Sequence, residues 1–426
     1  MSRYFLSENH LIRAEKTIPL GSQTFSKSRT QYPVGISPLY IESARGCHVR
    51  DLDGNKYLDL VSSLASITLG YRNQDVNRAV KKQMKIGVSL SLPGKLEAEV
   101  AELICELVPS AEMVRFGKNG TDATSAAIRL ARAYTGKDHV AVCGYHGWQD
   151  WYIGSTSRNK GVPKVVSELT HPFPYNDLDF LQTLLESNNE IACVIMEPMN
   201  IDFPKTGYLE GVRALTKRHG VLLVFDETIT GFRFSSGGAQ ELFGVTPDLS
   251  TFGKGIANGY PLSAIVGKRE IMMEMEEIFF SGTFGGELLS LAAAKVVLER
   301  HLNGTLCEDL AGIGLKIAEG VNSIALGLDM QETLKLSGHD TWKFLNWNAT
   351  EINSVDEIRT YFLQEMFASG TLILGSHNIS LAHGKHIQKI LNNYEKVLSR
   401  LSWAIKNNSI NSQLQVRPLK PLFKVR

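Results

Sequence analysis

The 426-residue sequence lacks several features that would assign it to a specialised class of protein. No apolar run approaches the roughly 20 residues that a membrane-spanning helix needs. The first 16 residues contain no apolar core of the kind found in a signal peptide. Net charge is also nearly absent, at +1, which argues against nucleic acid or an anionic membrane as the main partner. We therefore expect a cytoplasmic protein with neither of these partners.

Cysteine is scarce, and its five positions show no pattern that would link them. An odd number of scattered cysteines without paired spacing argues against a disulfide framework and against a metal site. We interpret them as buried thiols in a reducing compartment. They are Cys47, Cys105, Cys143, Cys193 and Cys307.

The composition is otherwise that of an ordinary globular protein, with 43% hydrophobic and 21% charged residues. The length predicts two or three structural units. We expect an N-terminal segment with a small antiparallel meander (1–66), a large α/β domain (67–296) and a smaller C-terminal α+β domain (297–426). Within the last of these, the tail from residue 408 is expected to be poorly ordered.

The region from residue 113 to 252 alternates buried strands with helical patterns. Apolar runs at 113–117, 139–143, 191–196 and 221–225 each end in a polar or glycine-containing cluster. In parallel α/β sheets, ligands bind at the carboxyl ends of the strands. This pattern predicts a mostly parallel, doubly wound sheet with one active crevice.

The stretch from Val221 to Gly255 supplies a carboxylate and a lysine at two such strand ends. Asp226 closes the apolar run 221–225, and Lys254 follows the strand expected at 248–252 between two glycines. A lysine that a ligand can approach closely can form a Schiff base with a carbonyl group. A buried aspartate can pair with the protonated ring nitrogen of pyridoxal phosphate. Taken alone, a Gly-Lys-Gly turn is more often a solvated loop than a Schiff-base site.

Two further stretches predict a binding site for a flat, phosphorylated ligand. The sequence RFGKNGTDAT runs into a helical pattern, so the free backbone N–H groups of a helix N-terminus could hold an anion. It matches neither the P-loop nor GxGxxG, and a plain capped helix is the alternative. Tyr145 and His146 could lay a ring over a cofactor, although loop packing is the commoner role of such aromatic clusters.

Six motifs occur in the order typical of one family: RFGKNGTDAT, CGYHGW, IMEP, FDETITGFR, TFGKGIANGYP and SGTFGG. The sequence resembles class III pyridoxal phosphate-dependent aminotransferases. Within them it is similar to glutamate-1-semialdehyde aminomutase and to aminomutase-like sugar transaminases of surface-polysaccharide pathways. The resemblance extends from residue 51 to about 300. It implies fold type I, with a seven-stranded, mostly parallel sheet in the large domain and a smaller α+β domain.

The resemblance also implies the roles of individual residues. Lys254 would form the Schiff base and move the substrate proton, Asp226 would pair with the ring nitrogen, and Tyr145 would stack on the ring. Thr283 would reach the phosphate in the partner subunit, which implies a homodimer with shared active sites. The cofactor contacts implied are Asn119, Gly120, Thr121, Tyr145, His146, Glu197, Asp226, Lys254 and Thr283, with no metal ligand.

The sequence departs from the aminomutase at positions expected to face the substrate. Lys27, with Arg29 nearby, stands where the aminomutase has an arginine in its N-terminal loop. A lysine lacks the bidentate fork that suits a carboxylate. The SWGP stretch of the family is replaced by SSLA at 62–65, and the pattern at 375–383 is altered.

These departures indicate a transaminase that moves an amino group from an amino acid, with glutamate expected, to a polar aldehyde or ketone such as a sugar. Glutamate-1-semialdehyde 2,1-aminomutase activity is the first alternative. A lyase or racemase using the same cofactor is the second. A non-catalytic protein that kept the fold is a distant third, because Lys254 and Asp226 are both present.

Overall fold

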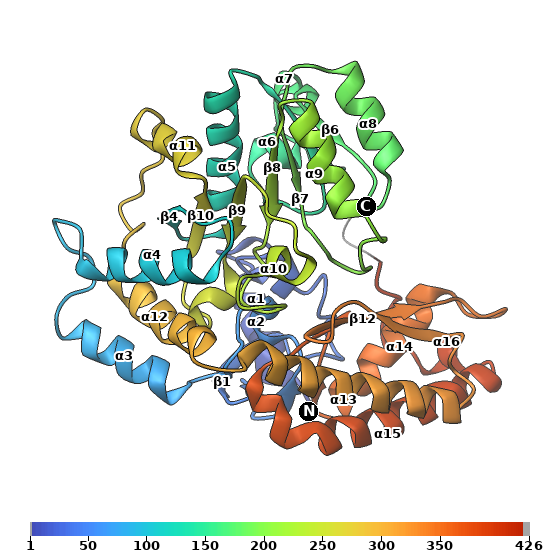
Figure 1. Ribbon diagram of the computed structural model, residues 1–426. Coiled ribbons are helices and arrows are strands. Elements are labelled where there is room, and N and C mark those ends of the chain that lie inside the picture. The colour runs from blue at the N-terminus through green and yellow to red at the C-terminus, as the bar shows by residue number, and fades with distance from the viewer. Residues whose placement is uncertain (1, 421–426) are drawn as a thin grey trace. The chain divides into compact units, whose positions relative to one another are not determined.

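The computed structural model describes residues 2–420, which form two compact units (Figure 1). The first unit contains residues 2–64, 68–73 and 309–420, and the second contains 65–67 and 74–308. The chain therefore starts in the first unit, builds the second and returns. The division into three segments that the sequence suggested stays a prediction.

A seven-stranded sheet forms the centre of the second unit. Its order is β4-β10-β9-β8-β7-β5-β6, and only β10 runs antiparallel to its neighbours, which are β4 and β9. The predicted mostly parallel sheet is therefore confirmed. The strands are β4 (Met113–Gly117), β5 (His139–Cys143), β6 (Thr170–Pro172), β7 (Ile191–Met196), β8 (Leu222–Asp226), β9 (Leu249–Phe252) and β10 (Ser263–Gly267).

Helices cover both faces of this sheet, which explains why its strands are apolar without interruption. Cys193 and Ile195 of β7 belong to the core on the side of α5 (Gly120–Thr135). Val194 and Met196 belong to the core on the side of α8 (Leu178–Ser187) and α9 (Tyr208–Arg218). Figure 1 shows α5 on one side of the central strands and α9 on the other. Burying each large aliphatic side chain stabilises the fold by about 1.5–3 kcal/mol. The sheet therefore holds the ends of its strands in fixed positions.

The other helices of the second unit pack around this layer or form its loops. The helices α3 (Gln74–Met84) and α4 (Lys95–Leu107) both pack against α12 (Leu288–Leu302). The short elements are α6 (Asp150–Ile153), α7 (Lys164–Glu168), α10 (Ala239–Phe243), η3 (Lys254–Ala257), α11 (Arg269–Met272) and η4 (Met273–Glu276).

The first unit contains the predicted antiparallel meander, β1 (Ile41–Arg45), β2 (His48–Asp51) and β3 (Lys56–Asp59). The short strand β13 (Thr371–Leu372) extends the meander by pairing in parallel with β3. A second, antiparallel sheet has the order β11-β12-β14. Its strands are β11 (Leu334–Ser337), β12 (Trp342–Trp347) and β14 (Ser376–Asn378).

Helices complete the first unit. The helix α14 (Val355–Ala368) begins with a capping box between Ser354 and Glu357, and it packs against α15 (Ile387–Lys406) and α16 (Ile410–Gln413). The remaining helical elements are α1 (Phe5–Ala14), η1 (Pro19–Gly21), η2 (Phe25–Lys27), α13 (Leu306–Gly327) and η5 (Leu381–His386).

Two sequence-based expectations need correction. The sequence favours a short first helix at residues 9–17, whereas α1 spans Phe5–Ala14. The tail was expected to be poorly ordered from residue 408, and this is wrong for residues 408–420. Ile410 is fully buried and the Tyr361 hydroxyl donates a 2.9 Å hydrogen bond to Gln413 Oε1, because α16 packs on α14. Residues 421–426 lie outside the described part of the chain.

The cysteines are free thiols, and all are buried except the half-buried Cys105. Among residues 2–420, no helix combines the length and the apolar character required to cross a membrane.

Candidate active site

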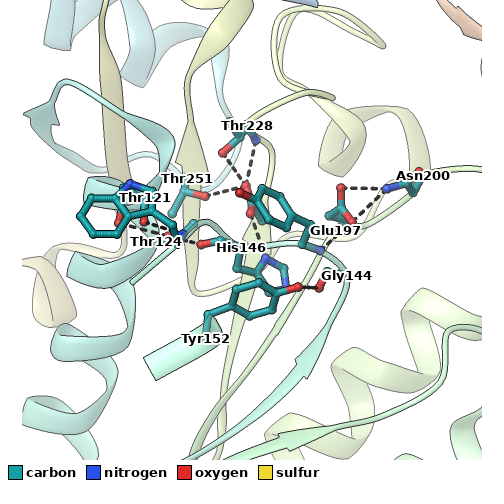
Figure 2. Close-up of polar contacts among 12 residues, drawn as sticks. Thr121, Thr124, Gly144, His146, Tyr152, Glu197, Asn200, Thr228 and Thr251 are labelled. Atoms are coloured by element: carbon teal, nitrogen blue, oxygen red, sulfur yellow. Dashed lines mark hydrogen bonds and ion pairs between the residues drawn. The ribbon is translucent and has the colours of Figure 1, made fainter. Parts of the chain in front are cut away.

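Polar side chains gather at the carboxyl ends of three neighbouring strands, β5, β7 and β8, as predicted. His146 follows β5, and its Nδ1 lies 2.9 Å from Oδ2 of Asp226, the last residue of β8. Tyr145 donates its backbone N–H to Glu197 Oε2 just beyond β7, at 3.1 Å. Figure 2 shows His146 and Glu197 with the polar contacts around them. The sheet topology therefore joins segments that are 80 residues apart in the sequence.

Asp226 is buried but fully surrounded by hydrogen-bond donors. In addition to His146, its Oδ1 accepts from the backbone N–H of Thr228 at 3.0 Å, from the Thr228 hydroxyl at 2.5 Å and from the Thr251 hydroxyl at 3.1 Å. Burial alone would raise the pKa of this carboxyl, but the hydrogen bond and charge of His146 and the Thr228 donors lower the pKa below its ordinary value. Asp226 is therefore held as a carboxylate inside the protein.

His146 is a positioning group for this carboxylate. An ionised carboxylate only accepts hydrogen bonds, so Nδ1 of His146 must carry the proton in this contact. The backbone carbonyl of His146 accepts from the Thr124 hydroxyl at 2.9 Å, and its ring stacks near Trp151 at 6.4 Å between centroids. Within the described residues, the buried Nε2 has no hydrogen-bond partner.

Lys254 begins the 3₁₀ turn η3, directly after β9. Its φ of 42° lies in the left-handed region, which is uncommon for a residue with a side chain and is a form of strain found at functional sites. Removal from water lowers the pKa of its amine, and Arg233 adds to this effect. The nearby carboxylates of Asp226 and Glu197 oppose the shift but do not cancel it. More of the amine is therefore neutral, and nucleophilic, than in free lysine.

The N-terminus of α5 lies at the same edge of the sheet as these residues, and it can bind an anion. Asn119 is the N-cap, and Asp122 accepts the backbone N–H groups of Lys118 and Asn119 at 3.0 and 2.8 Å. The first N–H groups of a helix, here those of Gly120 and Thr121, have no partner within the helix. A Cβ on Gly120 would come within 2.9 Å of the Thr228 methyl group. Glycine therefore allows the backbone of residue 120 to lie this close to Thr228.

Glu197 accepts hydrogen bonds from two neighbouring residues, Tyr145 and Asn200. Besides the N–H of Tyr145, it accepts from the Asn200 amide at 2.9 and 3.0 Å, one bond to each carboxylate oxygen (Figure 2). The ring of Tyr145 stands edge-on to Tyr152 at 5.7 Å and remains 44% exposed. The exposed ring is available to contact a ligand.

Thr283 is not part of this cluster. It lies exposed on the loop before α12, in a separate hollow of about 390 Å³ that is also lined by Lys118 and Asp122. Its implied contact with the cofactor of a partner subunit stays a prediction.

Sequence reasoning missed Thr228, Thr251 and Asn200 as parts of the site. Thr228 could have been found, because a threonine two residues after an aspartate often bonds to its carboxylate in a local turn. Thr251 could not, since its pairing opposite Asp226 depends on the register of β8 with β9.

In the first unit, two positions at which the sequence differs from the aminomutase lie close together. The amine of Lys27 lies 3.4 Å from the Ser63 hydroxyl, and both line a hollow of about 390 Å³. Ser63 belongs to a turn, residues 62–65, in which four consecutive residues have positive φ, from 47° to 68°. Such a conformation costs roughly 1–2 kcal/mol per residue. Arg29 instead pairs with Glu15 at 2.5 Å and does not line the hollow.

This fold and this site are those of an α/β enzyme whose polar cluster lies at the carboxyl ends of the strands. A family model described as "Aminotransferase class-III" matches residues 31–382, so the chain belongs to the class III aminotransferase family, whose cofactor is pyridoxal phosphate.

Three comparisons illustrate this membership. The chain is 40% identical to a "Glutamate-1-semialdehyde 2,1-aminomutase" of Syntrophobacter fumaroxidans over 71% of this chain and 73% of that one. It is 34% identical to a "3-aminobutyryl-CoA aminotransferase" of Cloacimonas acidaminovorans over 86% and 89%. The solved structure of the pyridoxal phosphate internal aldimine form of the FumI protein of Sphingopyxis sp. MTA144 matches with a TM-score of 0.88 and 25% identity, over 97% and 98% of the two chains.

The residues present fit pyridoxal phosphate. A buried carboxylate held ionised suits a protonated ring nitrogen, a lysine of lowered pKa suits a carbonyl, and a helix N-terminus suits a phosphate.

Proposed function

We propose that this enzyme transfers an amino group from an amino acid, with glutamate as the expected donor, to a polar aldehyde or ketone such as a sugar. The observation that carries the amino-transfer chemistry is a buried, ionised Asp226 close enough to act electrostatically on Lys254, whose amine has a lowered pKa. The choice of a polar acceptor rests on the hollow around Lys27.

Bound pyridoxal phosphate supplies an electron sink for the bonds at the substrate's amine-bearing carbon. Lys254 would hold the cofactor. Once released, it would move a proton from the donor carbon to the cofactor in the first half-reaction, and from the cofactor to the acceptor carbon in the second. Asp226 would keep the ring nitrogen protonated, and His146 with Thr251 would keep Asp226 ionised. Gly120 and Thr121 would bind the phosphate through backbone N–H groups.

Tyr145 and Glu197 would shape the remainder of this cofactor site. The exposed ring of Tyr145 would stack on the flat cofactor, with its loop fixed by the hydrogen bond from its N–H to Glu197. Thr283 would complete the site of a partner subunit, so we propose a homodimer. We also propose a cytoplasmic location, where the free cysteines would stay reduced.

The hollow around Lys27 supports a polar acceptor. Most of its lining is apolar, and its polar members include Gln23, Lys27, Asp59, Ser63 and Tyr71. Asp59 accepts the Tyr71 hydroxyl at 2.7 Å, and burial raises the pKa of its carboxyl despite that bond and the charge of Lys27. A mixture of donors and acceptors suits a hydroxylated molecule better than a lone carboxylate, for which a guanidinium fork is the usual partner.

Glutamate-1-semialdehyde 2,1-aminomutase activity is the second candidate, supported by the 40% identity to an aminomutase. The two candidates differ in whether an external donor is required. The visible spectrum of the purified holoenzyme should be recorded before and after single amino acids are added in excess.

Bleaching of the cofactor's visible band by one amino acid, with release of the matching keto acid, would support amino transfer. Isomerisation of glutamate-1-semialdehyde without any donor would favour the aminomutase. A band that no donor alters, together with no isomerisation, would contradict both candidates and move lyase or racemase chemistry ahead of them.

A further inference from the structure

One face of the meander in the first unit carries a row of cations. Across β2 and β3, Arg50 is paired directly with Lys56, and across β1 and β2, Arg45 is paired with His48. Paired residues point to the same face of a sheet, and so do residues two apart on one strand. These four basic side chains therefore project together.

Two more cations join them from outside the sheet. Arg72, on the chain segment after β3, and Lys389, on α15, line the same hollow, which has a volume of about 610 Å³. Six of its lining residues are basic and none is acidic. The full lining is Ser43, Ala44, Arg45, His48, Val49, Arg50, Lys56, Leu58, Arg72 and Lys389.

The charges in this hollow are not neutralised within the described residues. Arg50, Lys56 and Lys389 are exposed, and they form no ion pair there, nor do Arg45 and Arg72. Other cations of the same unit form ion pairs, such as Lys343 with Asp340 at 2.9 Å and Arg400 with Glu365 at 2.5 Å.

This arrangement costs stability in the free protein. Like charges directly opposite on neighbouring strands destabilise a sheet. Their field also acts on His48, whose pKa is lowered by burial and then by His386, Lys389 and Lys56. A concave surface lined by one sign of charge focuses the potential and concentrates ions of the opposite sign.

We propose that this hollow binds a small anion that carries at least two phosphate groups. Arginine forks match phosphate oxygens in pairs, and lysines add point charges. Five permanent cations, spread over three strands, a loop and a helix, exceed what a single monoanion can neutralise. The volume is within the range of sites that hold small organic ligands.

A metal ion is the rival occupant, because Cys47, His48 and His386 place ligand atoms within 4.8 Å of one another at the edge of this surface. Two observations oppose it. Burial raises the pKa of the Cys47 thiol to about 11, so the thiolate form that binds metals is scarce at neutral pH. The lysines that act on His48 would also repel a divalent cation.

The test is titration calorimetry of the holoenzyme with sodium pyrophosphate at constant ionic strength. Loading the enzyme with its own cofactor first keeps the N-terminus of α5 occupied. We expect saturable binding of one pyrophosphate per chain. The pair Arg50→Gln and Lys56→Gln should weaken it at least tenfold, and Arg72→Gln, outside the strands, at least threefold.

The matched control is the pair Lys316→Gln and Lys396→Gln, exposed cations of α13 and α15 that remove the same charge. This pair should bind pyrophosphate as the wild type does. Equal weakening by the control pair, or no saturable binding by the wild type, would overturn the proposal.

Two further arms identify the feature that is recognised. Orthophosphate should bind at least tenfold more weakly than pyrophosphate if two phosphate groups are required, and equal affinities would overturn that requirement. ADP should bind at least as well as pyrophosphate if the natural ligand is a nucleotide, whereas weaker binding of ADP would support an inorganic polyphosphate.

A melting experiment separates binding from misfolding. Without added anion, the Arg50→Gln and Lys56→Gln variant should melt at or above the wild-type temperature, because a repulsion is removed. Pyrophosphate should raise the melting temperature of the wild type only. The proposal would be contradicted if the variant melted at a lower temperature than the wild type and pyrophosphate raised the melting temperature of both proteins equally.

Discussion

Thr251 lies opposite Asp226 across the parallel pair β8 and β9, and its hydroxyl donates a 3.1 Å hydrogen bond to Asp226 Oδ1. Strand register alone therefore supplies the carboxylate with one of its donors. The other donors come from the turn after β8 and from the loop after β5, so three separate segments set the ionisation of one side chain.

Replacing Thr251 by valine should weaken catalysis without preventing folding. Valine keeps the shape but removes one donor, so the pKa of Asp226 should rise and kcat should fall by roughly tenfold, equivalent to about 1.4 kcal/mol. Steady-state kinetics would measure this change. Thr216→Val is the matched control, since that buried hydroxyl bonds to the Arg213 carbonyl of α9; equal losses in both variants would contradict the specific role of Thr251.

Asp226→Asn should have a larger effect, because it removes the negative charge itself. We expect kcat to fall by at least about 100-fold, or roughly 2.7 kcal/mol, while the bound cofactor remains detectable. Single-turnover kinetics with the amino donor would measure the loss. Full activity in this variant would remove the electrostatic role from Asp226.

Lys254→Ala should abolish turnover while leaving the folded structure intact. The predicted cause is loss of both the group that holds the cofactor and the group that moves the proton. Borohydride treatment followed by peptide mass analysis should attach the cofactor to the peptide containing Lys254 in the wild type. No attachment should occur in the variant, and attachment at another lysine would show that the assignment is wrong.

Lys27→Ala should raise the KM for the acceptor by roughly tenfold and leave the half-reaction with the donor unchanged. The reason is that the Lys27 amine lines the hollow together with Ser63, whereas Arg29 is paired with Glu15. Arg29→Ala is therefore the control, and its acceptor KM should stay near the wild-type value. An unchanged KM in Lys27→Ala would exclude this lysine from acceptor binding.

Acid should destabilise the first unit in a defined pH window. Burial lowers the pKa of His383 to about 4, while its Nδ1 accepts the Ser380 N–H and its Nε2 donates to the Asp59 carbonyl, both at 2.9 Å. An unfolded histidine binds a proton near pH 6.5. Between about pH 6.5 and 4 the unfolded state therefore binds more protons. The stabilisation, on the order of 3 kcal/mol, is complete above pH 6.5 and is lost as the pH falls through about 4.

Urea unfolding at pH 7 and at pH 4.5 would measure this loss. The His383→Gln variant should be less stable at pH 7 and should lose less on acidification. Identical pH dependence in the two proteins would show that His383 is not the group responsible.

The sequence alone predicted a mostly parallel sheet, several of its strands, and the strand ends at which the candidate site residues lie. Buried strands need continuous apolar runs and amphipathic helices need a 3.6-residue period, so both leave local signals, as at 191–196 and in α4. The family motifs added the roles proposed for Lys254 and Asp226, because each motif is contiguous in the chain.

Tertiary structure alone decided which distant residues meet. The bond from Thr251 to Asp226, the contact of Lys27 with Ser63 and the row of cations on the meander all depend on strand register or chain folding. These contacts join residues that are between 6 and 36 positions apart, as Arg50 and Lys56 or Lys27 and Ser63 are, and they leave no periodic signal in the sequence. The first helix and the order in residues 408–420 were also set by packing, since short polar segments gain their stability from the surfaces they contact.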